Sequence, residues 1–173
     1  MVGDGFCRGL HEFGFVVGAG VAAPHIGDRS AHNLALAKFH YGWMLGGVTA
    51  KDKWYRGNWE VLEELFAGGQ SYPKSSYVAG EATMLRYNFA TGTRWVPFFD
   101  AGIGVLATDI GNPDLGTVFE FNGQIGPGIN FFWRKNSAVS LQYRFTHYSN
   151  AGIKEPNQGV NEHMFYVGVA WYF

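Results

Sequence analysis

The sequence has little charge of either sign and almost no cysteine. Its 173 residues include 13 Lys and Arg against 14 Asp and Glu, a net charge of −1, so it lacks the basic surface that binds nucleic acid. Its one cysteine, Cys7, excludes an internal disulfide and any metal site built from several cysteines, and we interpret this thiol as incidental. No run of about 18 apolar residues occurs, so we expect no transmembrane helix.

The N-terminus lacks the features of a signal peptide. Met1 and Val2 are followed by Gly-Asp-Gly rather than by a basic stretch and an apolar stretch. The chain is therefore either cytosolic or a mature form that begins with an added Met. The composition bears on this choice, because 25 glycines and 17% aromatic residues are unusual for a soluble α/β domain. Such a composition is typical of β-barrels, including those of outer membranes.

Side chains alternate along the chain with a period of two, which indicates strands with two different faces. Eight runs show this alternation: 11–21, 30–46, 55–68, 77–91, 94–107, 117–132, 137–147 and 162–173. We predict an all-β fold, an eight-stranded antiparallel transmembrane β-barrel of the outer membrane. Residues 1–173 form a single domain in this interpretation, with residues 1–10 as a periplasmic N-terminal segment.

The predicted connections alternate in length. The longer ones lie near residues 22–29, 69–76, 108–116 and 148–161, and the shorter ones near residues 47–54, 92–93 and 133–136. This pattern is typical of a membrane barrel with long outer loops and short periplasmic turns, and an even number of strands puts both termini on the periplasmic side.

One face of the runs is apolar, and the other carries small, polar and charged residues. In the seventh run, Val139 and Leu141 oppose Ser140 and Gln142. Eight strands leave an interior just wide enough for side chains, so we predict a plugged lumen with paired charges rather than a channel. The polar face collects Glu60, Glu64, Arg86, Asn88, Asp100, Glu120, Asn122, Gln124 and Arg144. The alternative is a lipocalin-like soluble barrel, whose solvent face would hold more Lys and Glu than this face does.

Aromatic residues also favour the membrane. The chain ends in Trp171-Tyr172-Phe173, as outer-membrane barrels commonly do. All six tryptophans fall at the predicted periplasmic ends of strands or in the turns there, which indicates an interfacial girdle. They are Trp43, Trp54, Trp59, Trp95, Trp133 and Trp171. Glu63 does not fit, because strict alternation places it on the lipid face; a bulge near Leu62 and Glu63 would remove this conflict.

The outward face of the seventh run continues through Phe145 to His147 and Ser149. Two residues that lie two positions apart on an extended chain share a face, about 6.5–7 Å apart along the strand. The lipid face is a poor place for an idle His and Ser. A nucleophilic serine needs a general base within reach and a third group that orients the base. The His-x-Ser pattern alone is nevertheless weak, since it is common by chance.

The surrounding segment, residues 147–161, resembles the C-terminal signature of PagL-type lipid A 3-O-deacylases. It reads His-x-Ser-Asn-Ala-Gly over residues 147–152 and Pro-Asn-x-Gly over residues 156–159. A weaker resemblance extends to residues 86–89 and 97–105. Members of that family are outer-membrane barrels that remove the 3-position hydroxyacyl chain of lipid A, at a site that faces the outer leaflet.

The resemblance implies a role for each matching residue. Ser149 is expected to be the nucleophile and His147 the general base. Asn157 is expected to help form the oxyanion hole, with assistance from Asn150, and Gly152 belongs to the same substrate-binding loop. Asn, Gly and Pro are also ordinary turn residues, so this loop has a purely structural interpretation as well, which we prefer for Gly152 and for the second glycine of the motif.

The third member of the triad departs from the family pattern. The family has a Glu at the position of Asn161, and here Glu162 follows it. By alternation Asn161 points outward with His147, whereas Glu162 points into the lumen unless the loop breaks the pattern. Either residue therefore completes the triad. An Asn fixes the tautomer of the His but does not stabilise the imidazolium by charge, which implies a slower enzyme. His163 is interpreted as an interfacial residue.

The expected function is that of an outer-membrane serine esterase of a Gram-negative cell. It would act on lipid A of lipopolysaccharide among outer-membrane lipids, through an acyl-Ser149 intermediate and without a metal or cofactor. His25, His32 and His40 lack metal-ligand spacing and are interpreted as loop and lumen residues. Two alternatives stay open: a phospholipase-like barrel, and a structural or adhesive barrel whose triad has lapsed, which the Asn161 departure supports. A homodimer is also open.

Overall fold

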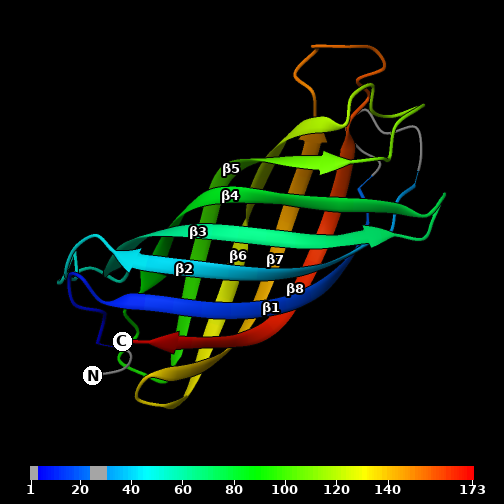
Figure 1. The fold of residues 1–173 in the computed structure, drawn as a ribbon. Helices are drawn as coiled ribbons and strands as arrows, with labels where there is room; N and C mark the ends of the chain where they lie inside the picture. Colours follow the sequence, from blue (N-terminus) through cyan, green and yellow to red (C-terminus); the bar gives the residue numbers. More distant parts are fainter. Residues whose placement is uncertain (1–3, 24–30) are drawn as a thin grey trace.

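The computed structural model of the chain describes residues 4–23 and 31–173 and shows one closed antiparallel barrel (Figure 1). Each strand pairs with its neighbours in chain order, and β8 closes the barrel on β1. The strands are β1 (His11–Ala22), β2 (Leu34–Met44), β3 (Gly57–Gln70), β4 (Ser76–Phe89), β5 (Trp95–Thr108), β6 (Phe119–Arg134), β7 (Ser137–Ser149) and β8 (Val160–Tyr172). Among the described residues, no helix is long and apolar enough to cross a membrane.

The predicted strands agree with the observed ones to within a few residues. The largest difference is at β2, which begins at Leu34 and ends at Met44 rather than at residue 46. Residues 31–33 of the predicted run are not in a strand, and residue 30 lies outside the described residues. Strand β7 extends two residues beyond its predicted end and so includes Ser149. Ser149 is therefore held in the hydrogen-bonded wall of the barrel and not in a loop.

The predicted alternation of long and short connections is wrong at one place. The connection between β2 and β3, residues 45–56, is longer than the connection between β3 and β4, residues 71–75. The longer connection folds back on itself, since the N–H of Lys53 donates to the carbonyl oxygen of Ala50 at 2.9 Å and Thr49 bridges to Gly57. Its apolar Leu45 and Tyr55 continue the alternation beyond the strands, which made the loop look shorter in the sequence.

Charged side chains fill the lumen, as predicted. The Arg86 guanidinium donates to Asp100 at 2.8 Å and to Glu12 at 3.2 Å, and Arg144 contacts both Asp100 and Glu64. The polar residues assigned to the lumen are all buried: Glu60, Glu64, Arg86, Asn88, Asp100, Glu120, Asn122, Gln124 and Arg144. This network of opposite charges occupies the interior, so the lumen is plugged and does not form a channel.

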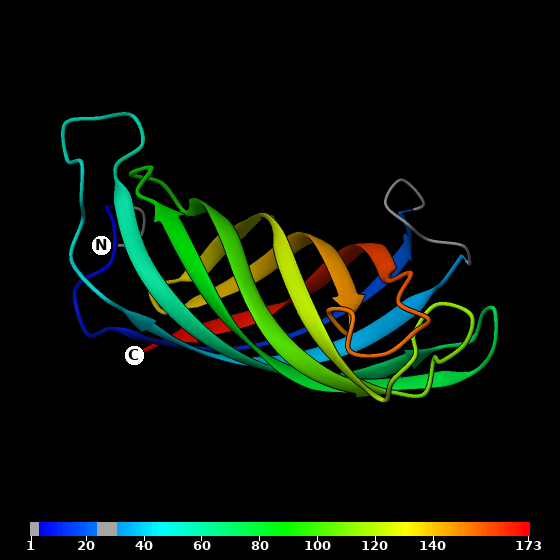
Figure 2. The ribbon, with the colours of Figure 1, turned by 90° about the horizontal axis from the view of Figure 1, so that it is seen from above.

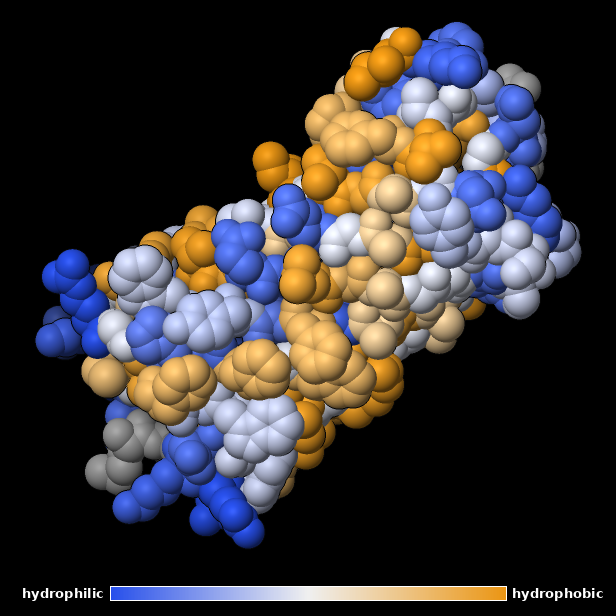
Figure 3. Space-filling view, viewed as in Figure 1, coloured by the Kyte–Doolittle hydropathy of each residue, from blue (hydrophilic) through white to orange (hydrophobic). Residues whose placement is uncertain are grey.

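The outer wall is apolar between two hydrophilic ends (Figure 3). Both termini lie at one end, and the loop 150–159 lies at the other, beside the loop 109–118 (Figures 1 and 2). The tryptophans of the predicted girdle are all exposed at the end that holds the termini: Trp43, Trp54, Trp59, Trp95, Trp133 and Trp171. This polarity is that of a membrane barrel with an interfacial aromatic belt.

Glu63 stays on the outer wall, so the bulge considered near Leu62 and Glu63 does not occur. The pairing of β3 with β4 runs without a shift from Gly57 to Gln70. The carboxylate of Glu63 instead accepts hydrogen bonds from the Thr83 hydroxyl, with distances of 2.9 and 3.1 Å to its two oxygens. A neighbouring hydroxyl, and not a change of strand register, accommodates this carboxylate.

Candidate active site

A groove of about 410 Å³ on the outer wall contains both His147 and Ser149. Both side chains are half-buried and point outward from the end of β7, as predicted. In the neighbouring strand β6, Ser149 pairs with Phe121 and His147 pairs with Gly123. The groove is lined by Glu81, Ala82, Thr83, Ile103, Gly104, Val105, Phe121, Asn122, Gly123, His147 and Ser149.

Asn161 lies directly beside His147. The two residues are partners in the pairing of β7 with β8, and the Asn161 Oδ1 atom is 2.6 Å from the His147 Nδ1 atom. An amide oxygen only accepts hydrogen bonds, so the contact assigns the ring proton to Nδ1. The Nε2 atom of His147 then carries the lone pair and has the form of a general base.

Glu162 lies on the other face of the same strand. It is fully buried and pairs with Thr146, and a Cβ added to Gly20 would come within 2.9 Å of its Oε2 atom. The alternation of β8 is therefore unbroken at this point. Of the two residues considered for the third position of the triad, the geometry puts Asn161 beside the imidazole and Glu162 inside the barrel.

The Ser149 hydroxyl makes no hydrogen bond within the part of the chain that the structure describes. Serine and histidine share a face and a groove but are not yet joined by a hydrogen bond. Catalytic hydrogen bonds are commonly loose in a free enzyme and tighten when substrate is bound. The arrangement thus places a serine hydroxyl, an imidazole and an amide on one face of the barrel wall.

The loop 150–159 is shaped by its own asparagines. The backbone N–H of Asn150 donates to Asn157 Oδ1 at 2.9 Å, and Asn150 Oδ1 accepts the N–H of Gly152 at 3.0 Å. Gly152 has φ +81°, a conformation that favours glycine. Asn150 and Gly152 therefore have a turn-forming role. The side-chain oxygen of Asn157 accepts the N–H of Asn150, so the side-chain N–H groups of Asn157 are the atoms that remain to donate hydrogen bonds.

Gly159 belongs to the site, although its sequence context predicts only a turn. Its φ is +82°, and a Cβ atom there would lie 2.8 Å from the His147 Cε1 atom. The carbonyl oxygen of Asp114 accepts the N–H groups of Gln158 and Gly159 at 2.9 and 3.3 Å, which holds the backbone in place. The sequence contains one indication of this contact. Gly159 precedes Asn161 by two residues, so alternation places Gly159 on the face of His147.

Gly159→Ala is expected to lower the rate of the catalysed reaction by about 10–100-fold while the barrel still folds. The added methyl group would displace the imidazole, and a displacement of about 1 Å can cost about 100-fold in rate. Gly92→Ala is the matched control, because Gly92 also has a positive φ, +76°, but its Cβ would meet nothing closer than 3.5 Å. Equal losses in the two variants would show that backbone strain, and not contact with His147, is responsible.

The remaining histidines have structural partners. His32 is buried, with Nε2 3.3 Å from Asp114 and Nδ1 2.7 Å from Gln70, and His40 lies in the lumen 2.7 Å from Glu12. The Tyr143 hydroxyl is 2.7 Å from His163. His25 lies outside the described residues, and Cys7 is exposed. Within residues 4–23 and 31–173, no three His, Cys, Asp or Glu side chains come together as metal ligands would.

The chain is similar to proteins of one known family. The model of the family "Lipid A 3-O-deacylase (PagL)" matches residues 35–170. The chain is 35% identical to the lipid A deacylase PagL of Pseudomonas aeruginosa over 158 residues, covering 84% of this chain and 88% of that protein. It is 34% identical to the lipid A deacylase PagL of Bordetella bronchiseptica over 118 residues, covering 62% of each chain.

Solved structures show the same architecture. The crystal structure of the outer-membrane enzyme PagL is matched with a TM-score of 0.66 at 25% identity, covering 89% of this chain and 97% of that one. The Neisserial surface protein A is matched with a TM-score of 0.65 at 13% identity, covering 96% and 98% of the two chains. At that identity the second likeness concerns the fold alone.

Proposed function

The chain belongs to the PagL family of lipid A 3-O-deacylases, and on this premise we propose that it hydrolyses the ester-linked 3-position acyl chain of lipid A in the outer membrane. The observation that carries the proposal is the placement of Ser149, His147 and Asn161. Ser149 and His147 line a groove in the apolar outer wall, and Asn161 contacts the Nδ1 atom of His147.

The reaction begins with attack on the ester. The Ser149 oxygen bonds to the ester carbonyl carbon while its proton passes to the Nε2 atom of His147. The negative charge that develops on the carbonyl oxygen would be stabilised by the amide N–H groups of Asn157, whose own oxygen is held by the N–H of Asn150. His147 then returns the proton to the sugar oxygen as the carbon–oxygen bond to the sugar breaks.

The second half-reaction releases the fatty acid. The acyl chain is now esterified to Ser149, and His147 takes a proton from a water molecule that attacks the acyl carbon. The bond to Ser149 breaks, and the serine recovers its proton from the imidazolium. In both steps Asn161 keeps the Nε2 atom of His147 directed to the reaction, because its oxygen holds the proton of Nδ1.

The position of the site suits a substrate in the outer leaflet. Ser149 ends β7 at the end of the barrel opposite the termini (Figure 1), and the exposed Leu141 and Val139 further along the strand belong to the apolar wall. With the termini in the periplasm, this end meets the outer leaflet. The sugar ester would lie at the serine, and the acyl chains would stay among the lipids. No extraction of the substrate from the membrane would be needed.

A side chain at Gly123 tests whether this groove binds the acyl chain. Gly123 lies between Ile103 and His147 in the pairing of the strands, and a Cβ there would meet nothing within 4 Å. Gly123→Phe is expected to fill the groove and lower kcat/KM for lipid A by about 100-fold, a loss of a few kcal/mol of transition-state binding. Release of free 3-hydroxy fatty acid, followed by gas chromatography, measures the effect.

Ala67→Phe is the control for the same change of surface. Ala67 is an exposed residue of the wall in β3, and it does not line the groove. A bulky aromatic residue at this position should leave the release of fatty acid close to that of the unmodified protein. Full activity of Gly123→Phe would contradict a role of the groove in acyl binding.

A further inference from the structure

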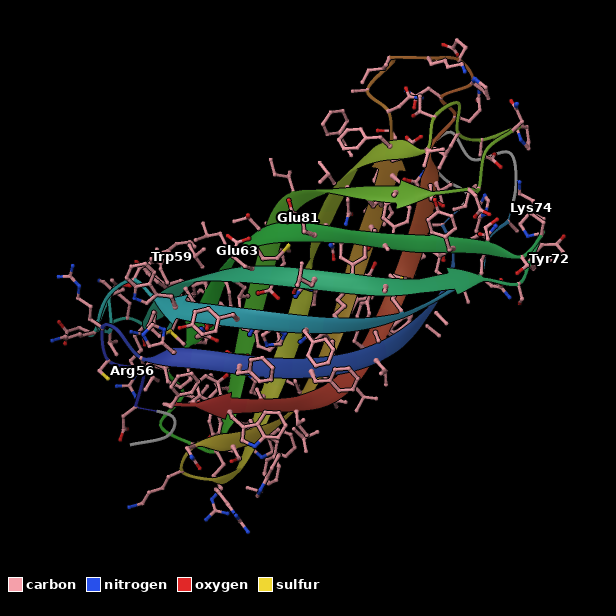
Figure 4. The ribbon with its side chains drawn as sticks, viewed as in Figure 1. Arg56, Trp59, Glu63, Tyr72, Lys74 and Glu81 are labelled. Atoms are coloured by element: carbon pink, nitrogen blue, oxygen red, sulfur yellow. The ribbon has the colours of Figure 1, made fainter. Side chains whose placement is uncertain are left out.

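A carboxyl group lies at the far end of the groove that contains Ser149. Glu81, on β4, is exposed on the outer wall, and Figure 4 shows it well away from either end of the barrel. In the space-filling view, hydrophilic atoms interrupt the apolar surface at this place (Figure 3). An ionisable group on the lipid-facing surface is costly and marks a functional position by default.

The strand register gives the separation of Glu81 from the serine. Ser149 pairs with Phe121, Phe121 pairs with Val105, and Val105 pairs with Glu81. The four residues therefore form one row across four adjacent strands. With strands about 4.8 Å apart, the row spans about 14 Å from the serine to the glutamate.

The floor between the two ends is apolar. Phe121 and Val105 occupy the row of the serine, and Gly123 and Ile103 occupy the row of His147. Next to Ile103, the row of His147 continues to Thr83 on β4, whose hydroxyl donates a hydrogen bond to Glu63. The groove thus has Ser149 at one end, an apolar path in the middle, and Thr83 and Glu81 at the other end.

Glu81 differs from Glu63 in its surroundings. Glu63 accepts two contacts from Thr83, whereas Glu81 has no hydrogen bond or ion pair with any of the described residues. A structural role in holding β4 against its neighbours would need such a partner. Glu81 instead lines the groove, with its carboxyl group exposed.

We propose that Glu81 sets the length of the acyl chain that this site accepts, an inference that rests on the proposed function. A path of about 14 Å holds an extended chain of about eleven carbons. A lipid tail of the bilayer is free to move away from Glu81, so the carboxyl group stays hydrated. A chain held by its ester at Ser149 follows a fixed path, so a longer chain would cover Glu81 and strip that water from it.

The experiment measures kcat/KM for lipid A species that differ in the 3-position chain, from about 8 to about 16 carbons. The refolded full chain is expected to lose at least about 10-fold in kcat/KM once the chain exceeds the groove. Glu81→Leu is expected to remove most of this loss and to leave the shortest substrate unaffected. Glu81→Gln keeps the size of the side chain and should shift the preference in the same direction.

Glu63→Leu is the matched control, since it removes a carboxyl group from the same wall outside the groove lining. Its length preference should equal that of the unmodified chain. An unchanged preference in Glu81→Leu or Glu81→Gln, or an equal change in Glu63→Leu, overturns the proposal. Absence of activity on every chain length, with a folded barrel, would instead contradict the proposed function, so the two failures are distinguishable.

Discussion

Ser149→Ala is expected to lower the rate of lipid A deacylation by at least about 10³-fold and to leave the barrel intact. Removing the nucleophile of a serine hydrolase leaves only the catalysis that comes from binding and the oxyanion hole. The side chain is half-buried and makes no hydrogen bond within the described chain, so its loss should not alter stability. Steady-state release of fatty acid by the refolded variant is the measurement, and electrophoretic heat-modifiability confirms that the barrel has folded.

Ser137→Ala provides the control for this variant. Ser137 begins the same strand, β7, at the end that holds the termini, far along the strand from the groove. Its replacement should leave the rate unchanged. If Ser149→Ala is as active as the unmodified chain, the serine is not the nucleophile. The ester would then be hydrolysed by direct attack of water.

Asn161→Ala is expected to lower kcat by about 10²-fold, whereas Glu162→Gln should change it by less than about 3-fold. The contact of 2.6 Å between Asn161 and the Nδ1 atom of His147 fixes the tautomer of the base, and alanine removes it. Glu162 lies in the lumen on the opposite face of β8 and is not among the residues that line the groove. Fatty-acid release by the two variants, compared at saturating lipid A, decides between the residues.

Asn161→Asp completes the same experiment. An Asp has the shape of Asn and adds a negative charge beside the imidazolium that forms during the reaction, so the rate is expected to rise by about 10-fold. The gain should be in kcat and not in KM, because the charge acts on the transition state. A large loss in Glu162→Gln together with normal activity of Asn161→Ala would show that the assignment of the third residue is wrong.

The barrel was largely predictable from the sequence because its wall has two chemically different faces. Alternation with a period of two identifies each strand, and the balance of charges on the polar face predicts a lumen of ion pairs. The same alternation along β7 predicted that His147 and Ser149 lie on its outward face. Alternation in β8 also predicted that Asn161 shares the face of His147 and that Glu162 points into the lumen. The structure shows both, although Asn161 is itself fully buried.

Features that depend on contacts between distant strands could not be predicted from the sequence. The groove requires the register of four strands, and only that register brings Glu81 and Ser149 into one row. Gly159 was interpreted as a turn residue because its contact with His147 depends on how the loop is held by Asp114. The bulge considered at Glu63 was wrong because the hydroxyl that accommodates this carboxylate comes from the neighbouring strand.

The most direct test is the mass of lipid A after incubation with the purified, refolded barrel. We expect the loss of one 3-hydroxyacyl chain from position 3, with the amide-linked chains intact. A phospholipid control in the same vesicles should be unchanged. Loss of fatty acid from the phospholipid alone would indicate a different lipid esterase. An unchanged mass for both lipids, from a barrel shown to be folded, would contradict the proposed deacylase activity and favour a structural barrel.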